Sequence, residues 1–225
     1  MSVVTLFCSL LLLLPEAPAP WRYVLEKVVP RVEVIRGQAK TAAIAGEALL
    51  PGDELRTGWR GRATVVVAER AARFEIAPST HVRLQEKVPG ALIVLHSGAL
   101  RALFDALLGH EERLVATPGA LLAVRGTRFA VRVEPGGEAV LAVFAGTVEV
   151  RPRDPALSSL AVGPGELCHF GPRRAPARRP FPPSFSEEGW ERHREMRAAP
   201  AAAPATSHPG KTTPGGPRAA GRGRG

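Results

Sequence analysis

Apolar and polar residues alternate in short runs over residues 31–171, and turn residues separate the runs. Examples are RVEVIRG near the start, RATVVVA and ARFEIA in the middle, and EAVLAVF and GTVEVRP near the end. A period of two is that of a β-strand with one buried face, and repeated short strands with frequent turns are typical of sandwiches and barrels. We therefore expect an all-β fold over residues 21–171, as an antiparallel β-sandwich or a β-helix-like domain.

The run LLAVRGTRFAVRV at 121–133 could be a phosphate-binding loop, a catalytic turn or a strand junction. Phe129, Val131 and Val133 recur with a period of two, and EPGG at 134–137 is suited to a hairpin turn. A phosphate loop needs a helix after the glycine, and no helical period follows. We therefore expect Gly126 to permit a bulge, or a close backbone approach, at the entry to a strand.

Both ends of the chain differ from this body in composition. MSVVTLFCSLLLLL at 1–14 is apolar and stops at Pro15, whereas a membrane span needs roughly 20 residues. We expect residues 1–20 to be a signal peptide, or else a retained anchor, and the protein to be exported to the periplasm or cell envelope. Residues 172–225 are rich in Pro, Ala, Gly and Arg, which predicts a disordered tail.

The formal net charge of +9 is concentrated in that tail. Residues 172–225 contain eleven Arg and Lys against four Glu, whereas residues 1–171 contain nineteen against seventeen Asp and Glu. A nearly balanced body gives no reason to expect a phosphate-binding face on the folded part. Nucleic-acid binding through the arginine-rich tail is therefore the weakest of the functional alternatives.

Catalytic and metal-binding patterns are missing from the sequence. Cleavage of a signal peptide would leave Cys168 as a lone thiol, and His169 beside it would point to the opposite face of a strand. The other histidines of the body are spread over separate segments, at His81, His96 and His110. No metal-ligand spacing exists. We expect no enzymatic activity, no cofactor and no metal.

The run AVRGTRFAVRVEPGGEAVLAVFAGTVEV resembles the core of the FecR domain. Upstream, GEALLPGDELRTGWRGRATVVV is similar to the family's Gly-Asp-x-x-x-Thr-Gly segment, and downstream LAVGPGELCHF resembles its closing Gly-Glu turn. The resemblance covers residues 31–171. It implies an extracytoplasmic β-module, which in the namesake relays outer-membrane receptor occupancy to a sigma factor. Because residues 1–30 alone precede it, we expect a stand-alone exported FecR-domain protein without the sigma-regulating segment.

The resemblance also implies two groups of residues. Candidate ligand-binding residues are Arg125, Thr127 and Arg128, since a guanidinium group can bind a carboxylate through two hydrogen bonds. In the structural alternative, Arg125 and Asp53 pair with each other or with turn amides. The structural signature comprises Gly52, Asp53, Thr57, Gly58, Gly126, Phe129, Gly146, Gly165 and Glu166.

The sequence as a whole favours a non-enzymatic exported domain that binds a partner protein or an envelope polymer, with a role in envelope signalling. The main alternative is a structural envelope or assembly protein that pairs through open strand edges, such as residues 138–150.

Overall fold

The computed structural model describes residues 21–84, 90–105 and 112–197. The strands are β1 Tyr23–Val29, β2 Val32–Arg36, β3 Ala39–Ala42, β4 Ala48–Leu49, β5 Glu54–Thr57, β6 Arg62–Val67, β7 Ala72–Ile76, β8 His81–Leu84, β9 Ala91–Phe104, β10 Arg113–Ala116, β11 Ala120–Val133, β12 Ala139–Pro152, β13 Leu160–Val162, β14 Glu166–Gly171 and β15 Arg174–Pro180. Short 3-10 helices span Ala68–Arg70, Trp190–Arg192 and Arg194–Met196.

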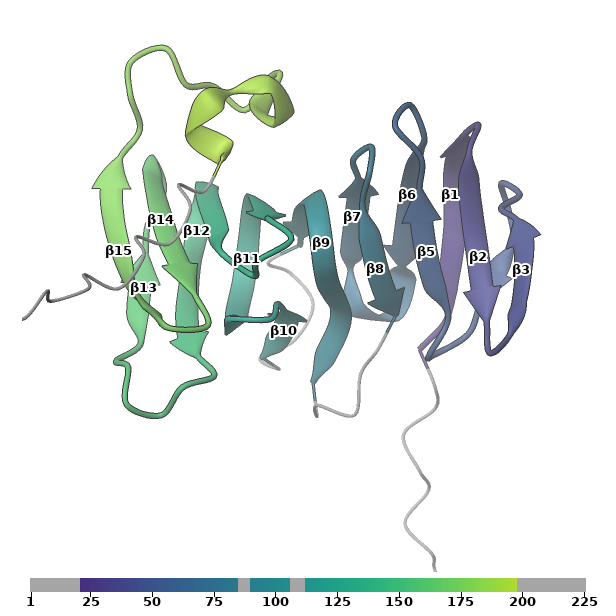
Figure 1. Cartoon of the computed structure of the whole chain (residues 1–225), viewed down its shortest axis with the longest axis horizontal. Helices are drawn as coiled ribbons and strands as arrows, with labels where there is room; N and C mark the ends of the chain where they lie inside the picture. The colour runs from purple at the N-terminus through teal and green to yellow at the C-terminus, as the bar shows by residue number, and fades with distance from the viewer. Residues whose placement is uncertain (1–20, 85–89, 106–111, 198–225) are drawn as a thin grey trace, which may run out of the picture.

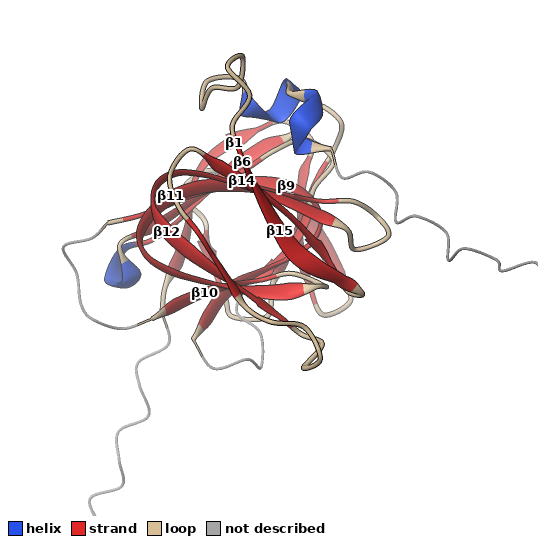
Figure 2. Cartoon of the chain, turned by 90° about the vertical axis from the view of Figure 1, so that its left-hand side faces the viewer, coloured by secondary structure: helices blue, strands red, loops and turns tan. Residues whose placement is uncertain are grey.

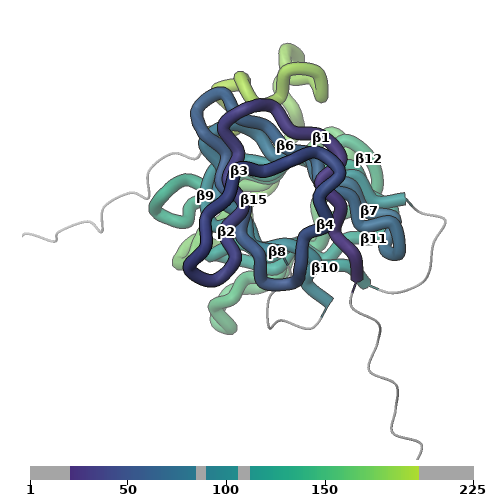
Figure 3. The backbone as a smooth tube through the Cα atoms, turned by 90° about the vertical axis from the view of Figure 1, so that its right-hand side faces the viewer, coloured from purple at the N-terminus to yellow at the C-terminus, as the bar shows by residue number. Residues whose placement is uncertain are grey.

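All fifteen strands belong to one hydrogen-bonded sheet that folds into two layers. The first layer runs β4-β1-β6-β7 and continues through the C-terminal halves of β9 and β11 and the N-terminal half of β12 to β14 and β15. The second runs β3-β2-β5-β8, then the other halves of β9, β11 and β12, with β10 between β9 and β11 and with β13 at its end. End-on, the strands surround a common interior (Figures 2 and 3).

Large apolar side chains from both layers fill this interior as one cluster. Phe74 and Phe129 come from the first layer, and Leu55 and Val82 come from the second. Alternation along each strand turns these residues inward, because successive side chains point to opposite faces of a sheet. The prediction of an all-β sandwich-like domain is confirmed, with one difference: the β9–β10 pair is parallel.

Each of the three long strands changes layer at a glycine. Gly98 in β9, Gly126 in β11 and Gly146 in β12 have φ angles of 89°, 56° and 74°. The β11–β12 register shifts between Arg125 and Arg128, where the sequence predicts a bulge at Gly126. A positive φ is open to glycine at little cost, so these positions let one strand serve both layers.

The predicted open edge at residues 138–150 is wrong. These residues lie largely in β12, which pairs with β11 on one side and with β13 and β14 on the other (Figure 1). The described sheet ends instead at β3, β4, β13 and β15. Pro176 and Pro180 lie in β15, and proline cannot donate to a further strand.

The predicted boundary at residue 171 is also wrong. Residues 174–180 form β15 on β14, and the following residues bury Phe185, Trp190 and Met196 against the sheet. The segment is polar and Pro-rich in composition, but three large apolar side chains are enough to fix a short segment on an apolar surface. Residues 1–20 and 198–225, with the predicted signal peptide and the remainder of the predicted disordered tail, lie outside the described residues.

Candidate functional site

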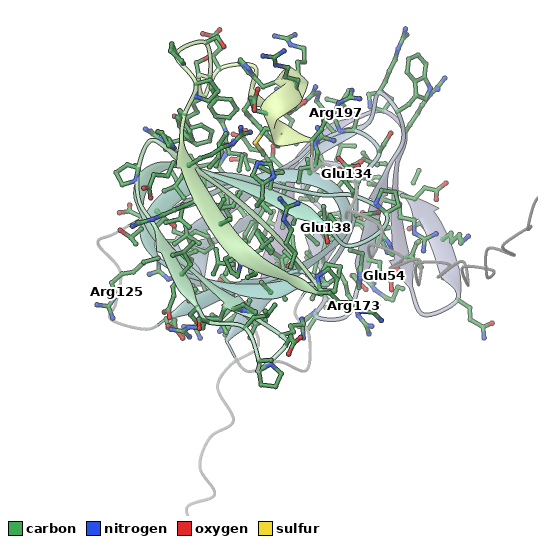
Figure 4. The ribbon with its side chains drawn as sticks, turned by 60° about the vertical axis from the view of Figure 1, so that its left-hand side comes forward. Glu54, Arg125, Glu134, Glu138, Arg173 and Arg197 are labelled. Atoms are coloured by element: carbon green, nitrogen blue, oxygen red, sulfur yellow. The ribbon has the colours of Figure 1, made fainter. Side chains whose placement is uncertain are left out.

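The three candidate ligand-binding residues lie where β11 bends. Arg125 is exposed, and Figure 4 shows it at the periphery of the molecule. Thr127 is 2% exposed, and its Oγ1 has no hydrogen-bond partner among the described residues. Arg128 is exposed and its Nε lies 3.1 Å from Glu187 Oε1. The bend thus turns neighbouring side chains in different directions.

An open groove of about 560 Å³ runs beside this bend, and we call it the bend groove. Gly126, Thr127 and Arg128 line it from β11, and the ends of β6, β7 and β9 complete it. Phe104 and Asp105 at the end of β9 also belong to the lining. The bend groove therefore contains Thr127 and Arg128 from the predicted ligand-binding set.

An ion pair on the neighbouring strands adds charge of both signs to the same groove. Arg73 Nη1 of β7 lies 2.7 Å from Glu26 Oε2 of β1, and both residues line the groove. Both side chains are more than one-third exposed, so this pair is available to a ligand and contributes little to stability. The groove combines small apolar residues with charged groups at its rim, which is the composition of a binding site for a peptide or a polar small molecule.

Asp53 has a structural role, with a partner that the sequence did not predict. It is 2% exposed and accepts hydrogen bonds from Arg36 Nε at 2.8 Å and from the Leu50 amide at 2.8 Å. Arg36 Nη2 donates to the second carboxylate oxygen at 2.6 Å. The predicted pairing of Asp53 with Arg125 is therefore wrong, whereas its predicted contact with a turn amide is present.

The environment of Asp53 favours the ionised carboxylate. Burial by itself would raise the pKa of Asp53, but the hydrogen bonds from Arg36 and Leu50, together with the charge of Arg36, lower that pKa below its ordinary value. The pair joins β2 to the turn before β5, because Arg36 ends β2 and Asp53 precedes Glu54. It fixes part of the second layer, and neither residue lines the bend groove.

Other members of the structural signature support turns and the core. Thr57 Oγ1 donates to the Ala77 carbonyl at 2.7 Å and accepts from the Thr80 amide at 2.9 Å. Glu166 Oε2 accepts from the Gly163 amide at 2.7 Å, which closes the turn through Gly165. Thr57 and Glu166 thus bind backbone groups of the domain itself, which is a structural role.

The remaining signature residues are likewise placed in turns and in the core. Gly52 and Gly165 have φ angles of 93° and 78°. A Cβ on Gly58 would lie 3.1 Å from Cβ of Arg31, so the chain is close-packed at that turn. Phe129 is fully buried, and its ring stacks on Phe104 at a centroid distance of 6.2 Å.

The described residues contain no group of three or more His, Cys, Asp and Glu side chains that could hold a metal ion. Burial raises the pKa of the Cys168 thiol to about 12, so the reactive thiolate is scarce at neutral pH. Burial, followed by the charges of Arg179 and Arg174, lowers the pKa of His169. The Cys168 thiol is therefore not activated as a nucleophile.

Sequence reasoning missed a segment that packs beside the bend groove. Residues 181–197, which we call the strap, lie outside the ring of strands, with 3-10 helices shown in blue at the upper right of Figure 2. Figure 4 places Arg197, the last residue of the strap, well away from Arg125. The available signal was the spacing of Phe185, Trp190 and Met196 within an otherwise polar segment.

The strap and the bend groove share Arg128. This residue lines the groove and pairs with Glu187 of the strap, and Arg101 Nη1 of β9 lies 3.3 Å from the same Glu187 oxygen. The groove and the surface under the strap are therefore continuous across β9 and β11.

Comparison with protein families finds a match to part of this domain. Residues 53–149 match the model of the FecR protein family. No curated protein is significantly similar in sequence to the chain. Within the described residues, no helix is long and apolar enough to cross a membrane.

Two crystal structures, both of a candidate anti-sigma factor from Parabacteroides distasonis, are similar to this chain. Their sequence identities are 16% and 17%, and each has a TM-score of 0.45. The aligned region covers 57% of this chain and 59% of the solved one, so the chain spans somewhat more than half the length of that protein.

Proposed function

We propose that this chain, which carries a FecR domain at residues 53–149, is a non-enzymatic binding protein of the cell envelope that recognises a partner protein and takes part in envelope signalling. The observation that carries the proposal is the bend groove. Two of the candidate ligand-binding residues, Thr127 and Arg128, line this open site. A signature that only held the sandwich together would have no need to line such a site.

The chemistry of the groove supports a protein segment as the partner. Glu26 and Arg73 offer one charge of each sign, and Arg128 offers a guanidinium group that can take a carboxylate. Val66, Leu103 and the alanines of the lining offer apolar contact. Peptide segments combine such groups within a few residues, whereas a single small ion would engage only one of them.

Export is part of the proposal and is supported by the apolar run at 1–14. Mass spectrometry of the N-terminus, on protein from fractionated host cells, tests it. Cleavage near Ala19 and recovery outside the cytoplasm are the expected results. An intact N-terminus in the cytosolic fraction would remove the envelope from the proposal.

In-cell photocrosslinking tests partner binding. A photoreactive amino acid replaces Ala68, which is exposed and lines the bend groove, and the matched control replaces Lys40, which is exposed on β3. We expect one discrete protein adduct from position 68 and none from position 40. Equal labelling from both positions, no protein adduct from position 68, or a heterogeneous polymer-sized smear would contradict partner-protein binding at the groove.

A further inference from the structure

The outer face of the first layer is a shallow apolar surface made of small side chains. Ala99 of β9, Ala130 of β11 and Ala142 of β12 lie on it, and all three are fully buried beneath the strap. Ala130 and Ala142 are direct partners in the β11–β12 ladder. Alanines that adjoin in a sheet leave a depression that larger side chains from another segment can fill. We call this surface the strap face, with Val140 and Leu167 at its side.

Large side chains of the strap occupy this depression. Phe185, Trp190 and Met196 are 7%, 4% and 0% exposed. The ring of Phe185 stacks on Phe144 of β12 at a centroid distance of 6.2 Å with an interplanar angle of 6°. Aromatic anchors in small pockets are the features that dominate the binding of peptides to protein surfaces.

Charge complementarity adds specificity to the apolar contact. The Glu187 carboxylate pairs with Arg101 at 3.3 Å and with Arg128 at 3.1 Å. The Glu191 carboxylate pairs with Arg62 of β6. Arg101 also pairs with Glu75 of β7 at 2.6 Å. The arginines of the sheet therefore favour a glutamate at the two positions that Glu187 and Glu191 occupy.

The backbone of the strap is almost unattached to the sheet. Among the described residues, one backbone hydrogen bond joins them, from the Phe181 amide to the Gly165 carbonyl at 2.7 Å, where the strap begins. A further contact uses a side chain, since Arg132 Nη2 donates to the Glu191 carbonyl at 3.0 Å. The strap is therefore held as a bound peptide is held, through side-chain anchors rather than as a member of the ladder.

The match between strap and face is incomplete. Arg132 Nε and His169 Nδ1 are buried without a hydrogen-bond partner among the described residues. His169 lies two residues after Leu167 on β14, so both side chains point to the strap face. A buried polar atom without a partner costs free energy, which a ligand with an additional acceptor would recover. These two atoms are therefore available for hydrogen bonds that the strap does not make.

We propose that the strap face is a peptide-binding site, that residues 181–197 occupy it within the same chain, and that the partner displaces them with a segment carrying aromatic residues and glutamate. The inference rests on the proposed function, since it names the chemistry of that partner. Arg128 lines the bend groove and pairs with Glu187 of the strap. It would therefore contact the strap in the closed state and the partner once the strap is displaced.

A labelled peptide with the sequence of residues 181–197 is the probe, and fluorescence anisotropy on the full chain is the measurement. In the Phe185→Ala/Trp190→Ala variant the tethered strap loses its anchors while the face keeps its residues. We expect this variant to bind the free peptide at least tenfold more tightly than the wild-type chain, in which the tethered strap competes. Circular dichroism establishes that the variant is folded, and if it is not, Glu187→Arg/Glu191→Arg loosens the strap by charge instead.

A charge exchange separates specific docking from loose adhesion. Adding Arg128→Glu to the loosened chain is expected to weaken peptide binding about tenfold, and a peptide with Glu187→Arg is expected to recover most of the loss. Arg83→Glu is the matched control, because Arg83 is exposed on β8 in the second layer. It is expected to leave binding unchanged.

Three outcomes would overturn the inference. One is a folded, loosened chain that does not bind the peptide; another is equal weakening by Arg128→Glu and Arg83→Glu. The third is a wild-type dimer in light scattering that becomes a monomer in the Phe185→Ala/Trp190→Ala variant, which would make a second copy the ligand. None of these outcomes changes the photocrosslinking from position 68, so the inference can fail while the proposed function stands.

Discussion

A Cβ on Gly146 would lie 2.5 Å from the carbonyl oxygen of Gly126. The two glycines mark the points where neighbouring strands β12 and β11 pass from one layer to the other. Because the approach is backbone to backbone, neither strand can move away without breaking the ladder on both sides. The bend that presents Thr127 and Arg128 to the groove therefore depends on this pair.

Gly146→Ala is expected to destabilise the protein by about 3 kcal/mol or more, because the left-handed conformation and the clash add together. Gly165→Ala is the matched control. Gly165 has a similar φ of 78°, but a Cβ there would meet nothing within 4 Å. Gly165→Ala is expected to lower the free energy of unfolding only by the cost of the left-handed conformation, about 1–2 kcal/mol. Urea unfolding of both variants measures the difference, and equal losses would show that close packing at the bend has no effect.

Asp53→Asn is expected to lower the free energy of unfolding by about 2 kcal/mol at neutral pH, because it weakens hydrogen bonds between charged groups at a buried site. Glu26→Gln is the control, since its partner Arg73 is exposed and the pair is worth less than about 1 kcal/mol.

Asp53→Asn also changes the pH dependence of the free energy of unfolding. The folded pKa of Asp53 lies below its ordinary value of 3.8, so the stability it adds is present above that pH and is lost as the pH falls through the folded pKa. Asp53→Asn should therefore flatten the decline of stability below pH 3.8. An unchanged acid profile would contradict the role given to the Arg36 pair.

His169 predicts a pH effect of the same sign at a higher pH, with burial rather than an ion pair as its cause. Its folded pKa lies below its ordinary value of 6.5, because burial disfavours the charged ring. The unfolded chain therefore binds the proton first, and stability present above pH 6.5 is lost as the pH falls toward the folded pKa. His169→Gln should remove this part of the decline. Unfolding free energies at several pH values check it, and a variant with the same slope as the wild type would contradict the assignment.

Cys168 is expected to be inert in the folded protein. It is fully buried and its pKa is raised to about 12. With Cys8 replaced by Ser, a thiol reagent at pH 8 should modify the chain only after denaturant is added. Rapid modification of the folded chain would show that β14 is more open than the structure indicates.

The sequence was sufficient to predict the strands, because alternation along segments such as 128–133 reports one buried face directly. It also located the hairpin at 134–137, where the Glu134 amide donates to the Glu138 carbonyl at 2.8 Å. Gly126 was placed correctly at a bulge, since few other reasons put a glycine inside a strand pattern.

The partners of the charged residues could not be predicted. Arg36 and Asp53 are seventeen residues apart and meet only because β2 pairs with β5. The composition of residues 172–225 does not predict the attachment of the strap. That attachment depends on three side chains and on a small-residue face that forms only when β9, β11 and β12 assemble.

Amide hydrogen exchange on the wild-type chain tests most directly whether the strap is a displaceable ligand of a preformed face. The account predicts that residues 182–197 exchange through an opening with a free energy well below that of global unfolding. Residues 98–103, 128–133 and 139–143 beneath them should keep the protection of the global fold, because their ladder bonds do not involve the strap. Exchange of the strap only at the rate of global unfolding would contradict the account, since the strap would then be an integral part of the sandwich.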